Sequence, residues 1–188
     1  MSRRVEVVDY DPAWPALSRE VGRSLRAAMG EVALRIDHIG STAVAGLAAK
    51  PVIDVQVSMA AFETVKAFKD PLERLGYVYR ADNPERTKRY FRKAPGSRRT
   101  HTHVRCAGSF SEQFPLLLRD YLRCHAAAAA EFATVKRHLA ERFPRDRAAT
   151  PTPRTRTSGS LSAALMSGRS CRGGRPGCPA PRRACGAG

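Results

Sequence analysis

The 188-residue sequence is short of acidic residues and has no long hydrophobic run. It contains 17 Asp and Glu residues against 33 Lys and Arg residues, a formal net charge of +16. Because no stretch of eighteen apolar residues occurs, the sequence predicts no membrane-spanning helix. The first residues lack the apolar core of a secretory signal, so we expect a cytoplasmic protein that does not act in a membrane. The excess of positive charge favours a polyanionic partner, namely a nucleic acid, a nucleotide or an acidic surface.

The charge is divided between two regions of different composition. Residues 149–188 contain seven arginines but no Lys, Asp or Glu, so this segment carries +7, whereas residues 1–148 carry +9. The 149–188 segment is rich in Gly, Pro, Ser and Thr, and it cannot bury enough apolar surface to offset its ordering entropy. Its cysteines recur every seven residues, unlike the close pairs of a zinc site. We therefore expect a folded domain over 1–148 and a disordered basic tail over 149–188.

Hydrophobic periodicity predicts an α+β fold in which helices pack against a mixed β-sheet. Helices are expected over 14–29, 60–75, 110–128 and 129–142. Strands are expected over 4–8, 34–39, 52–57, 76–79, 89–93 and 101–106, with the last two paired as a hairpin. Three helix-borne aromatic residues are expected in the core, namely Trp14, Phe110 and Phe114.

Gly40 and Ser41 follow the strand expected over 34–39 and lead into a tight turn. Glycine lets the backbone approach a phosphate closely, and serine adds a hydroxyl group. Asp54 lies in the next expected strand, where its carboxylate could hold Mg²⁺ or Mn²⁺ against the same phosphates, and Lys50 precedes it as a phosphate clamp. The alternative is an ordinary hairpin turn followed by a solvent-facing aspartate.

His101 and His103 are two residues apart on an expected strand, so their side chains project from the same face. If this strand lies beside the one that carries Asp54, one face collects two imidazoles and a carboxylate. Such a trio can bind a divalent metal, or act as a base and phosphate ligand. The spacing by itself favours the alternative, in which both histidines lie on the solvent face of an edge strand.

A basic cluster spans the expected hairpin, and Arg92 is its main candidate for a phosphate clamp. The cluster could bind a triphosphate or an RNA backbone, or it could simply form a solvated charged face. Its members are Arg86, Lys88, Arg89, Arg92, Lys93, Arg98 and Arg99.

Three further segments are distinctive, and they read DYDPAWP over 9–15, IDHIGSTAV over 36–44 and GLAAKPVIDV over 46–55. They resemble the GrpB family, also catalogued as the uncharacterised protein family UPF0157, and the resemblance covers roughly residues 5–149. This family is similar to the nucleotidyltransferase superfamily, so the resemblance implies a nucleotidyltransferase-like fold. It also implies that Gly40 and Ser41 hold nucleotide phosphates and that Asp54 holds the metal ion.

The nucleotidyltransferase pattern has a second metal-binding carboxylate two residues after the first. In this sequence the first is Asp54, and the second position is occupied by Gln56. The later strand that would supply a third carboxylate carries His101 and His103 instead. Two-metal phosphoryl transfer needs negative ligands that bridge both ions, and an amide does not supply that charge. The pattern therefore favours a one-metal or histidine-assisted variant, or a nucleotide-binding protein without turnover.

Three functions remain open at this stage. The first is a nucleotidyltransferase-like enzyme that uses Asp54, His101 and His103. The second is a non-catalytic module that assists or binds dephospho-CoA kinase, since the resemblance extends to a domain fused to that enzyme in actinobacteria. The third is a charge-driven nucleic-acid binder. The family pattern continues past 149 with a further helix, so the change of composition there suggests a reading-frame shift or a diverged end.

Overall fold

The computed structural model describes residues 6–62 and 64–143 of the chain. The expected domain boundary near 148, the tail over 149–188 and its cysteines lie outside the described residues. Within the described ranges, no helix is long and apolar enough to cross a membrane.

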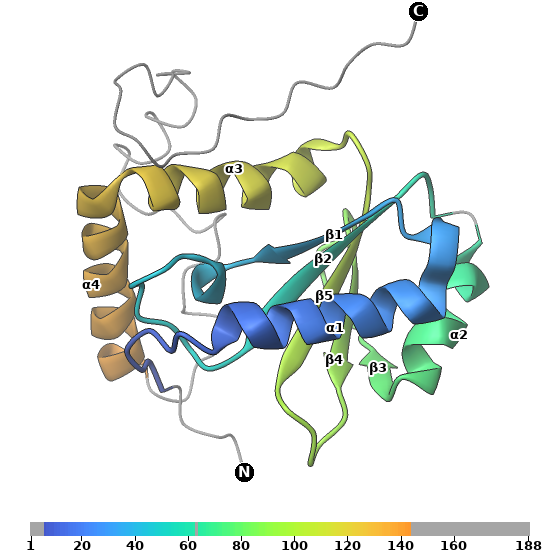
Figure 1. The fold of residues 1–188 in the computed structure, drawn as a ribbon, viewed down its shortest axis with the longest axis horizontal. Helices are drawn as coiled ribbons and strands as arrows, with labels where there is room; N and C mark the ends of the chain where they lie inside the picture. Colours follow the sequence, from blue (N-terminus) through green and yellow to red (C-terminus); the bar gives the residue numbers. More distant parts are fainter. Residues whose placement is uncertain (1–5, 63, 144–188) are drawn as a thin grey trace, which may run out of the picture.

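The described strands form one mixed sheet in the order β1-β2-β5-β4-β3 (Figure 1). Strands β2 and β5 run parallel, and the other neighbouring pairs are antiparallel. The strand bounds are Arg35–Ile39 for β1, Ile53–Met59 for β2, Tyr77–Tyr79 for β3, Arg89–Lys93 for β4 and Thr100–Cys106 for β5. The mixed sheet is as predicted, but β5 is an inner strand, so the edge-strand interpretation of its histidines is wrong.

Helices α1 (Trp14–Met29) and α2 (Val65–Arg74) cover one face of the sheet (Figure 1). The alternation of β2 turns its apolar residues toward these helices and its polar residues toward the opposite face. The main core therefore lies between the two helices and the sheet, and it includes Trp14, Leu25, Val55, Phe68 and Phe91.

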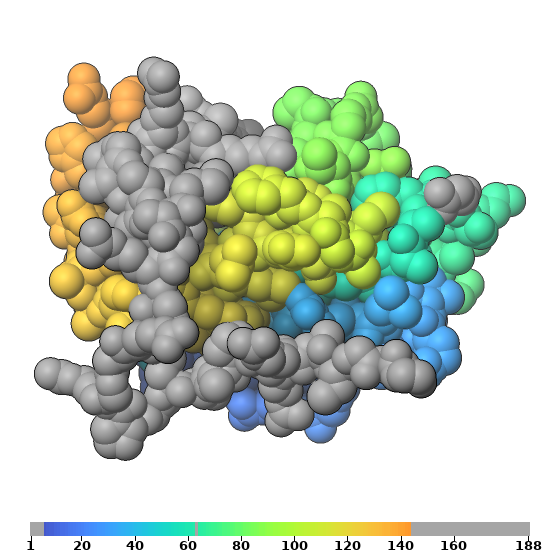
Figure 2. Space-filling view, turned by 90° about the horizontal axis from the view of Figure 1, so that it is seen from above, coloured from blue at the N-terminus to red at the C-terminus, as the bar shows by residue number. Residues whose placement is uncertain are grey.

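Helices α3 (Phe110–Cys124) and α4 (Ala126–Arg142) form a second layer on the other side, where α3 (yellow) lies beside α4 (orange) in Figure 2. A smaller core joins them to the loop between β1 and β2, and it includes Val44, Leu47, Leu118, Leu122 and Phe132. This second core holds the short turn η2 (Ser41–Ala43) in place above the sheet.

Local chemistry explains why most helix ends are where the sequence predicts them. A proline in the first turn and Gly30 after the last residue bound α1. Ser109 caps α3, because its hydroxyl oxygen accepts a hydrogen bond from the backbone N–H of Glu112. Pro71 lies inside α2, and the helix continues past it.

Four local predictions are wrong. Within the described residues, the strand expected over 4–8 is reduced to a single bridge between Val8 and Ala49. Helix α2 starts at Val65 rather than at 60, because β2 extends to Met59 and Phe62 packs against the core before the helix begins.

The other two concern α3. It ends at Cys124 rather than near 128, because the extended backbone of His125 interrupts the helix and its ring stacks on Tyr121. Phe110 and Phe114 belong to neither core: Phe110 is 61% exposed in the first turn of α3, and Phe114 is half-buried with its ring 5.5 Å from that of Phe110.

Candidate functional site

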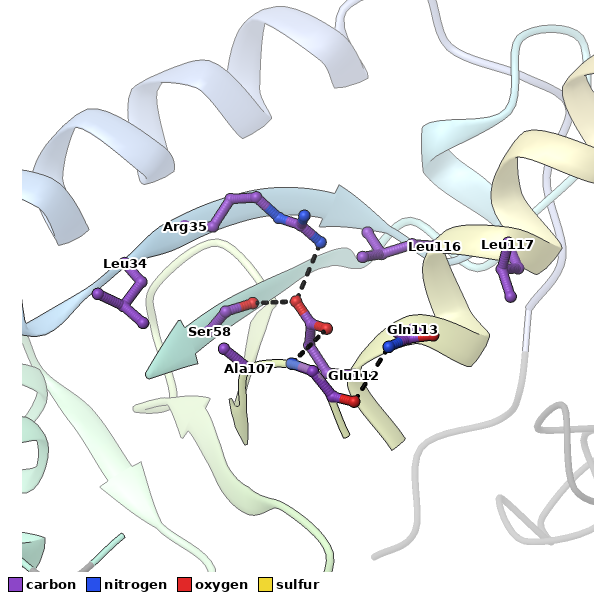
Figure 3. Close-up of a pocket in the computed structure, with 9 residues that line it drawn as sticks. Leu34, Arg35, Ser58, Ala107, Glu112, Gln113, Leu116 and Leu117 are labelled. Carbon is purple, nitrogen blue, oxygen red and sulfur yellow. Dashed lines mark hydrogen bonds and ion pairs between the residues drawn. The ribbon is translucent and has the colours of Figure 1, made fainter. Parts of the chain in front are cut away.

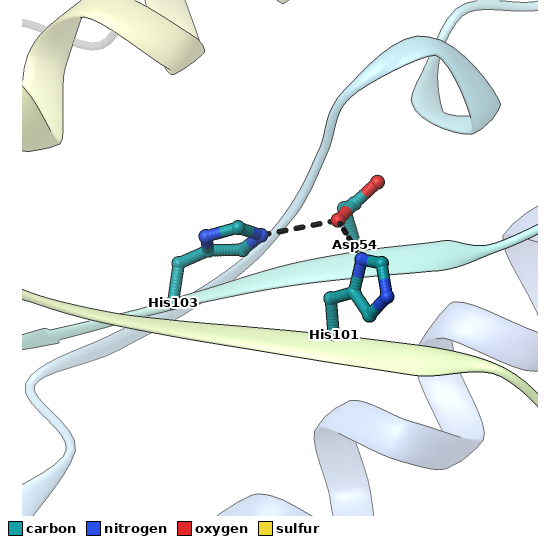
Figure 4. Close-up of side chains that lie close together, drawn as sticks. All are labelled: Asp54, His101 and His103. Carbon is teal, nitrogen blue, oxygen red and sulfur yellow. Dashed lines mark hydrogen bonds and ion pairs between the residues drawn. The ribbon is translucent and has the colours of Figure 1, made fainter. Parts of the chain in front are cut away.

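The parallel pairing of β2 with β5 brings three chemically active side chains together. Asp54 lies directly opposite His101, and Gln56 lies opposite His103. One oxygen of Asp54, Oδ1, is 3.2 Å from His101 Nδ1 and 3.1 Å from His103 Nε2 (Figure 4). The expectation that one face of the sheet collects two imidazoles and a carboxylate is therefore confirmed.

Asp54 is held ionised and His103 is held neutral. Burial opposes the charge of Asp54, but hydrogen bonds from His101 and His103 outweigh this effect and keep the pKa of Asp54 well below its usual range. Burial lowers the pKa of His103 to about 4, although the carboxylate of Asp54 acts in the opposite direction. A neutral imidazole beside an ionised carboxylate is the protonation state that a metal ion requires of its ligands.

The donor atoms fit one divalent ion. The single ligand atoms that the three residues offer all lie within 4.8 Å of one another, and the side chain of Asp54 is 29% exposed, so solvent reaches the group. Three protein ligands leave further coordination positions open for a substrate. Two imidazole nitrogens with one carboxylate suit Mn²⁺ and other transition ions better than Mg²⁺, which prefers oxygen ligands.

The Gly40-Ser41 turn covers this trio. Gly40 has a φ of +74°, and a Cβ atom built on it would be 3.1 Å from Asp54 Oδ2 and 3.3 Å from Asp54 Cβ. Only glycine therefore combines this backbone conformation with such a close approach to the carboxylate. The predicted juxtaposition of the turn with Asp54 is confirmed.

Two arginines of α3 hold the backbone of this turn. Arg119 donates to the carbonyl oxygen of His38 at 2.9 Å, and Arg123 donates to the carbonyl oxygen of Ala43 at 2.9 Å. Because both carbonyl oxygens accept from arginine, they are tied down on either side of Gly40. The sequence analysis missed both residues, since α3 carries no motif that marks them.

Lys136 of α4 is a further residue that the sequence analysis missed. Its ammonium group donates to the hydroxyl oxygen of Ser41 at 2.6 Å, and the residue is 5% exposed. The available signal was its position four residues after Phe132, where the apolar stripe of the helix predicts a hydrophobic side chain.

Lys50 and Arg92 are the two residues predicted to clamp a phosphate, and the structure places them beside different residues. The charge of Lys50, which is half-buried, lowers the pKa of Lys136, so the two ammonium groups lie in the same region. Arg92 lies opposite His101 in the β4–β5 pairing, and its Nε donates to the hydroxyl group of Tyr90 at 2.8 Å. Arg92 therefore borders the trio, whereas Lys50 is placed only near Lys136.

Tyr90 contacts both histidines of the trio, and the sequence analysis did not predict this role. Its ring stacks on His103 with centroids 5.1 Å apart and meets His101 edge to face at 5.4 Å. The guanidinium of Arg92 lies over the same ring, 5.0 Å from its centroid. Tyr90 thus fixes the orientation of both imidazoles and links them to Arg92.

The basic cluster predicted around the hairpin is not one continuous surface. Arg92 and Lys88 lie over Tyr90 on the side of the trio. Arg89 instead lies over the ring of Phe62, and Lys93 lies over Tyr77 and donates to the carbonyl oxygen of Leu75. The alternation of β4 therefore divides its basic residues between the two faces of the sheet.

Gln56, at the position of the expected second carboxylate, has a structural role. It is fully buried, its amide nitrogen donates to the carbonyl oxygen of Glu112 at 3.0 Å, and its oxygen accepts from Arg105 at 2.8 Å. The amide nitrogen thus holds the first turn of α3, and the amide oxygen binds Arg105 of β5. The site offers carboxylate ligation at Asp54 but not at 56, which fits one ion and not a pair.

A groove lies beside β1, and the polar groups that line it are hydrogen-bonded to one another. Its carboxylate, Glu112, accepts from Ser58 at 2.8 Å and from Arg35 at 3.0 Å, and Gln113 donates to the carbonyl oxygen of Gly108 (Figure 3). Because these polar groups bind one another, the groove offers no reactive group comparable with the trio.

Comparison with known proteins identifies the family. The GrpB protein family matches residues 4–151. UPF0157 protein YqkA of Bacillus subtilis is 34% identical over 142 residues, which cover 76% of this chain and 41% of YqkA. UPF0157 protein PA4798 of Pseudomonas aeruginosa is 39% identical over 149 residues, which cover 78% of this chain and 61% of PA4798. The chain thus spans less than two thirds of the length of these relatives.

A dephospho-CoA kinase of Mycobacterium tuberculosis is also similar. It is 34% identical over 155 residues, which cover 69% of this chain and 38% of the kinase. The kinase therefore shares a domain with this chain.

Solved structures agree with both the family and the fold. Conserved protein GrpB from Enterococcus faecalis superposes with a TM-score of 0.71 at 32% identity, and the match covers 86% of this chain and 93% of that protein. The Cid1 poly(U) polymerase superposes with a TM-score of 0.55 at 15% identity, over 85% of this chain and 50% of the polymerase. The second likeness shows the fold alone, which is nucleotidyltransferase-like as expected. The chain belongs to the GrpB family.

Proposed function

We propose that this protein binds a nucleoside triphosphate together with one divalent cation, as a one-metal relative of the nucleotidyltransferases. The observation that supports the proposal most strongly is the in-register trio of Asp54, His101 and His103 under the Gly40 turn. The fold alone would not suffice, because Gln56 removes the second carboxylate.

Asp54, His101 and His103 are the proposed ligands of the ion. The ion would supply positive charge against the phosphates of the nucleotide. With imidazole nitrogens in the ligand set, Mn²⁺ is the preferred ion and Mg²⁺ the weaker one.

The chain's own residues position the nucleotide in this proposal. The turn at Gly40 has no side chain in the way, so a phosphate can approach the backbone closely, and Ser41 offers a hydroxyl group to it. Arg92 borders the trio, Lys50 lies near Lys136, and both supply positive charge. A histidine that binds the ion has no free nitrogen to accept a proton. If the protein turns over, Asp54 and one histidine therefore hold the ion, and the other histidine, His101 or His103, is the proposed proton acceptor for the incoming hydroxyl group.

A thermal-shift screen of the full chain tests the proposal. Each of the four nucleoside triphosphates with Mn²⁺ or Mg²⁺ is added to the wild type, and at least one combination is expected to raise the melting temperature. Asp54→Ala is expected to abolish that shift, whereas Asp82→Ala, which removes an exposed carboxylate, is expected to keep it. The absence of any shift in the wild type would refute nucleotide binding.

A second candidate function is supported by the dephospho-CoA kinase relatives. In this version the domain binds a dephospho-CoA kinase as a non-catalytic module, and its metal site is not needed. Such binding predicts that the chain and the kinase co-purify, both as the wild type and as Asp54→Ala. Failure to co-purify would count against this function. A cytoplasmic location and nucleic-acid binding stay predictions.

A further inference from the structure

Lys136 is a buried ammonium group that has only neutral partners among the described residues. Its Nζ donates to Ser41 Oγ at 2.6 Å and lies 3.5 Å from the carbonyl oxygen of Ala48. No ion pair within the described ranges includes it. An ammonium group has three N–H donors, so one remains beyond these two contacts.

Such a group is costly for the folded state. Burial lowers the pKa of Lys136 to about 8, and the distant charge of Asp54 opposes this effect only in part. The apolar stripe of α4 would accept Leu or Met at this position, since the neighbouring ring of Phe132 and the small core around it are apolar. A buried lysine at such a position therefore indicates a functional rather than a stabilising role.

The position of the Lys136 ammonium group indicates which class of ligand it would bind. Its hydrogen-bond partner Ser41 directly follows Gly40, which lies against Asp54. The ammonium group therefore binds the turn whose first residue, Gly40, lies against Asp54 of the trio. An oxyanion there would accept the third N–H and neutralise the buried charge.

We propose that Lys136 is the phosphate-binding cation of the site, which takes the terminal phosphates of a polyphosphate ligand and couples their binding to the docking of α4. The identity of the ligand as a nucleotide rests on the proposed function, but the binding of a polyphosphate group does not. The coupling follows because the bond from Lys136 to Ser41 is a polar contact between α4 and the η2 turn, while Phe132 of α4 shares the small apolar core with the loop that follows this turn.

The test is a calorimetric titration of the full chain with inorganic triphosphate in the absence of metal. Lys136→Met removes the charge but keeps an apolar side chain of similar length, and Arg137→Met is the matched control on the same helix, since Arg137 pairs with exposed Asp9. We expect Lys136→Met to weaken triphosphate binding at least about 10-fold, and Arg137→Met to change it less than about 2-fold.

Melting temperatures of the same proteins supply a readout that a purely structural lysine would not give. Without ligand, Lys136→Met is expected to melt higher than the wild type, because the uncompensated buried charge is gone. Added triphosphate should raise the melting temperature of the wild type and leave that of the variant unchanged. A variant that melts lower but still responds to triphosphate would overturn the proposal.

The outcomes separate this inference from the proposed function. If triphosphate binds through Lys136 but no nucleotide does, the inference holds and nucleotide binding fails. If nucleotides bind equally well to the wild type and to Lys136→Met, nucleotide binding holds and the inference is wrong. If triphosphate does not bind the wild type at all, the inference is likewise wrong.

Discussion

His38 is the penultimate residue of β1, near the η2 turn, and its Nε2 lies 3.0 Å from the hydroxyl oxygen of Thr42. Burial lowers the pKa of His38 to about 4, with further lowering by Arg123 and Arg119, while Asp54 opposes the shift. The folded protein thus keeps this imidazole neutral in a pH range where the unfolded chain would protonate it. Stability from this group is present above the unfolded pKa of about 6.5 and is lost as the pH falls toward 4.

We predict that His38→Gln reduces the loss of stability on acidification. Between pH 7 and pH 5 the wild type should lose up to about 2 kcal/mol more free energy of unfolding than the variant, because the unfolded state gains a proton that the folded state refuses. Glutamine keeps a hydrogen-bonding group for Thr42. Urea unfolding at both pH values measures the difference, and equal losses in the two proteins would contradict the assignment.

Gly40 and Gly46 form a matched pair for the turn. Both have a φ of +74°, but a Cβ on Gly40 would press against Asp54, whereas a Cβ on Gly46 would meet nothing within 4 Å. Alanine at either position should cost about 1–3 kcal/mol of stability from backbone strain. We predict that Gly40→Ala also weakens Mn²⁺ binding about 10-fold or more, because Asp54 must move, and that Gly46→Ala does not. Equal Mn²⁺ affinities in the two variants would show that the turn does not control the carboxylate.

At the scale of elements, the decisive contact is the parallel pairing of β2 with β5. The alternation of each strand was readable in the sequence, so the faces of Asp54, His101 and His103 could be predicted. Their meeting could not be, because a parallel pairing joins segments separated by a long crossover and no local signal sets its register. The two-residue spacing of the histidines became informative only once β5 was placed beside β2.

The capped start of α3 is the element that places Glu112 over the sheet. We predict that Ser109→Ala lowers the free energy of unfolding by about 1 kcal/mol, because the backbone N–H of Glu112 loses its side-chain acceptor and the carbonyl oxygen of Cys106 loses its hydroxyl donor. Ser24→Ala is the control, since its hydroxyl group bonds only the helix backbone at an exposed site of α1, and the change should be within about 0.5 kcal/mol. Chemical denaturation measures both, and equal small effects would contradict the role of the cap.

What the sequence could not show at this scale is which residues come from other elements to complete the site. Tyr90 and Lys136 are both such residues, one on β4 and the other on α4. Periodicity places Tyr90 on a strand face, but only the antiparallel register with β5 puts it against His103. Lys136 interrupts the apolar stripe of α4, and a charged residue at an apolar position of a helix indicates a buried charge.

At the scale of the whole molecule, the described residues form two apolar cores, and the polar trio of Asp54, His101 and His103 lies outside both. The main core fills the space between α1, α2 and the sheet, and the smaller core joins α3 and α4 to the loop after β1. The trio and the Gly40 turn lie where the sheet face meets the smaller core. The arginines and lysines of β4 are divided between the two faces of the sheet, so they do not form one continuous surface for a nucleic acid.

The most direct test of the account is a calorimetric titration of the full chain with Mn²⁺, repeated with a non-hydrolysable nucleoside triphosphate present. We predict one Mn²⁺ site per chain, tighter when the nucleotide is bound, with Mg²⁺ weaker at the same site. Asp54→Asn should reduce Mn²⁺ affinity about 100-fold or more, since it removes the charged ligand of the trio. Mn²⁺ binding that is absent in the wild type, or unchanged in Asp54→Asn, would contradict the central claim that this trio is a metal site.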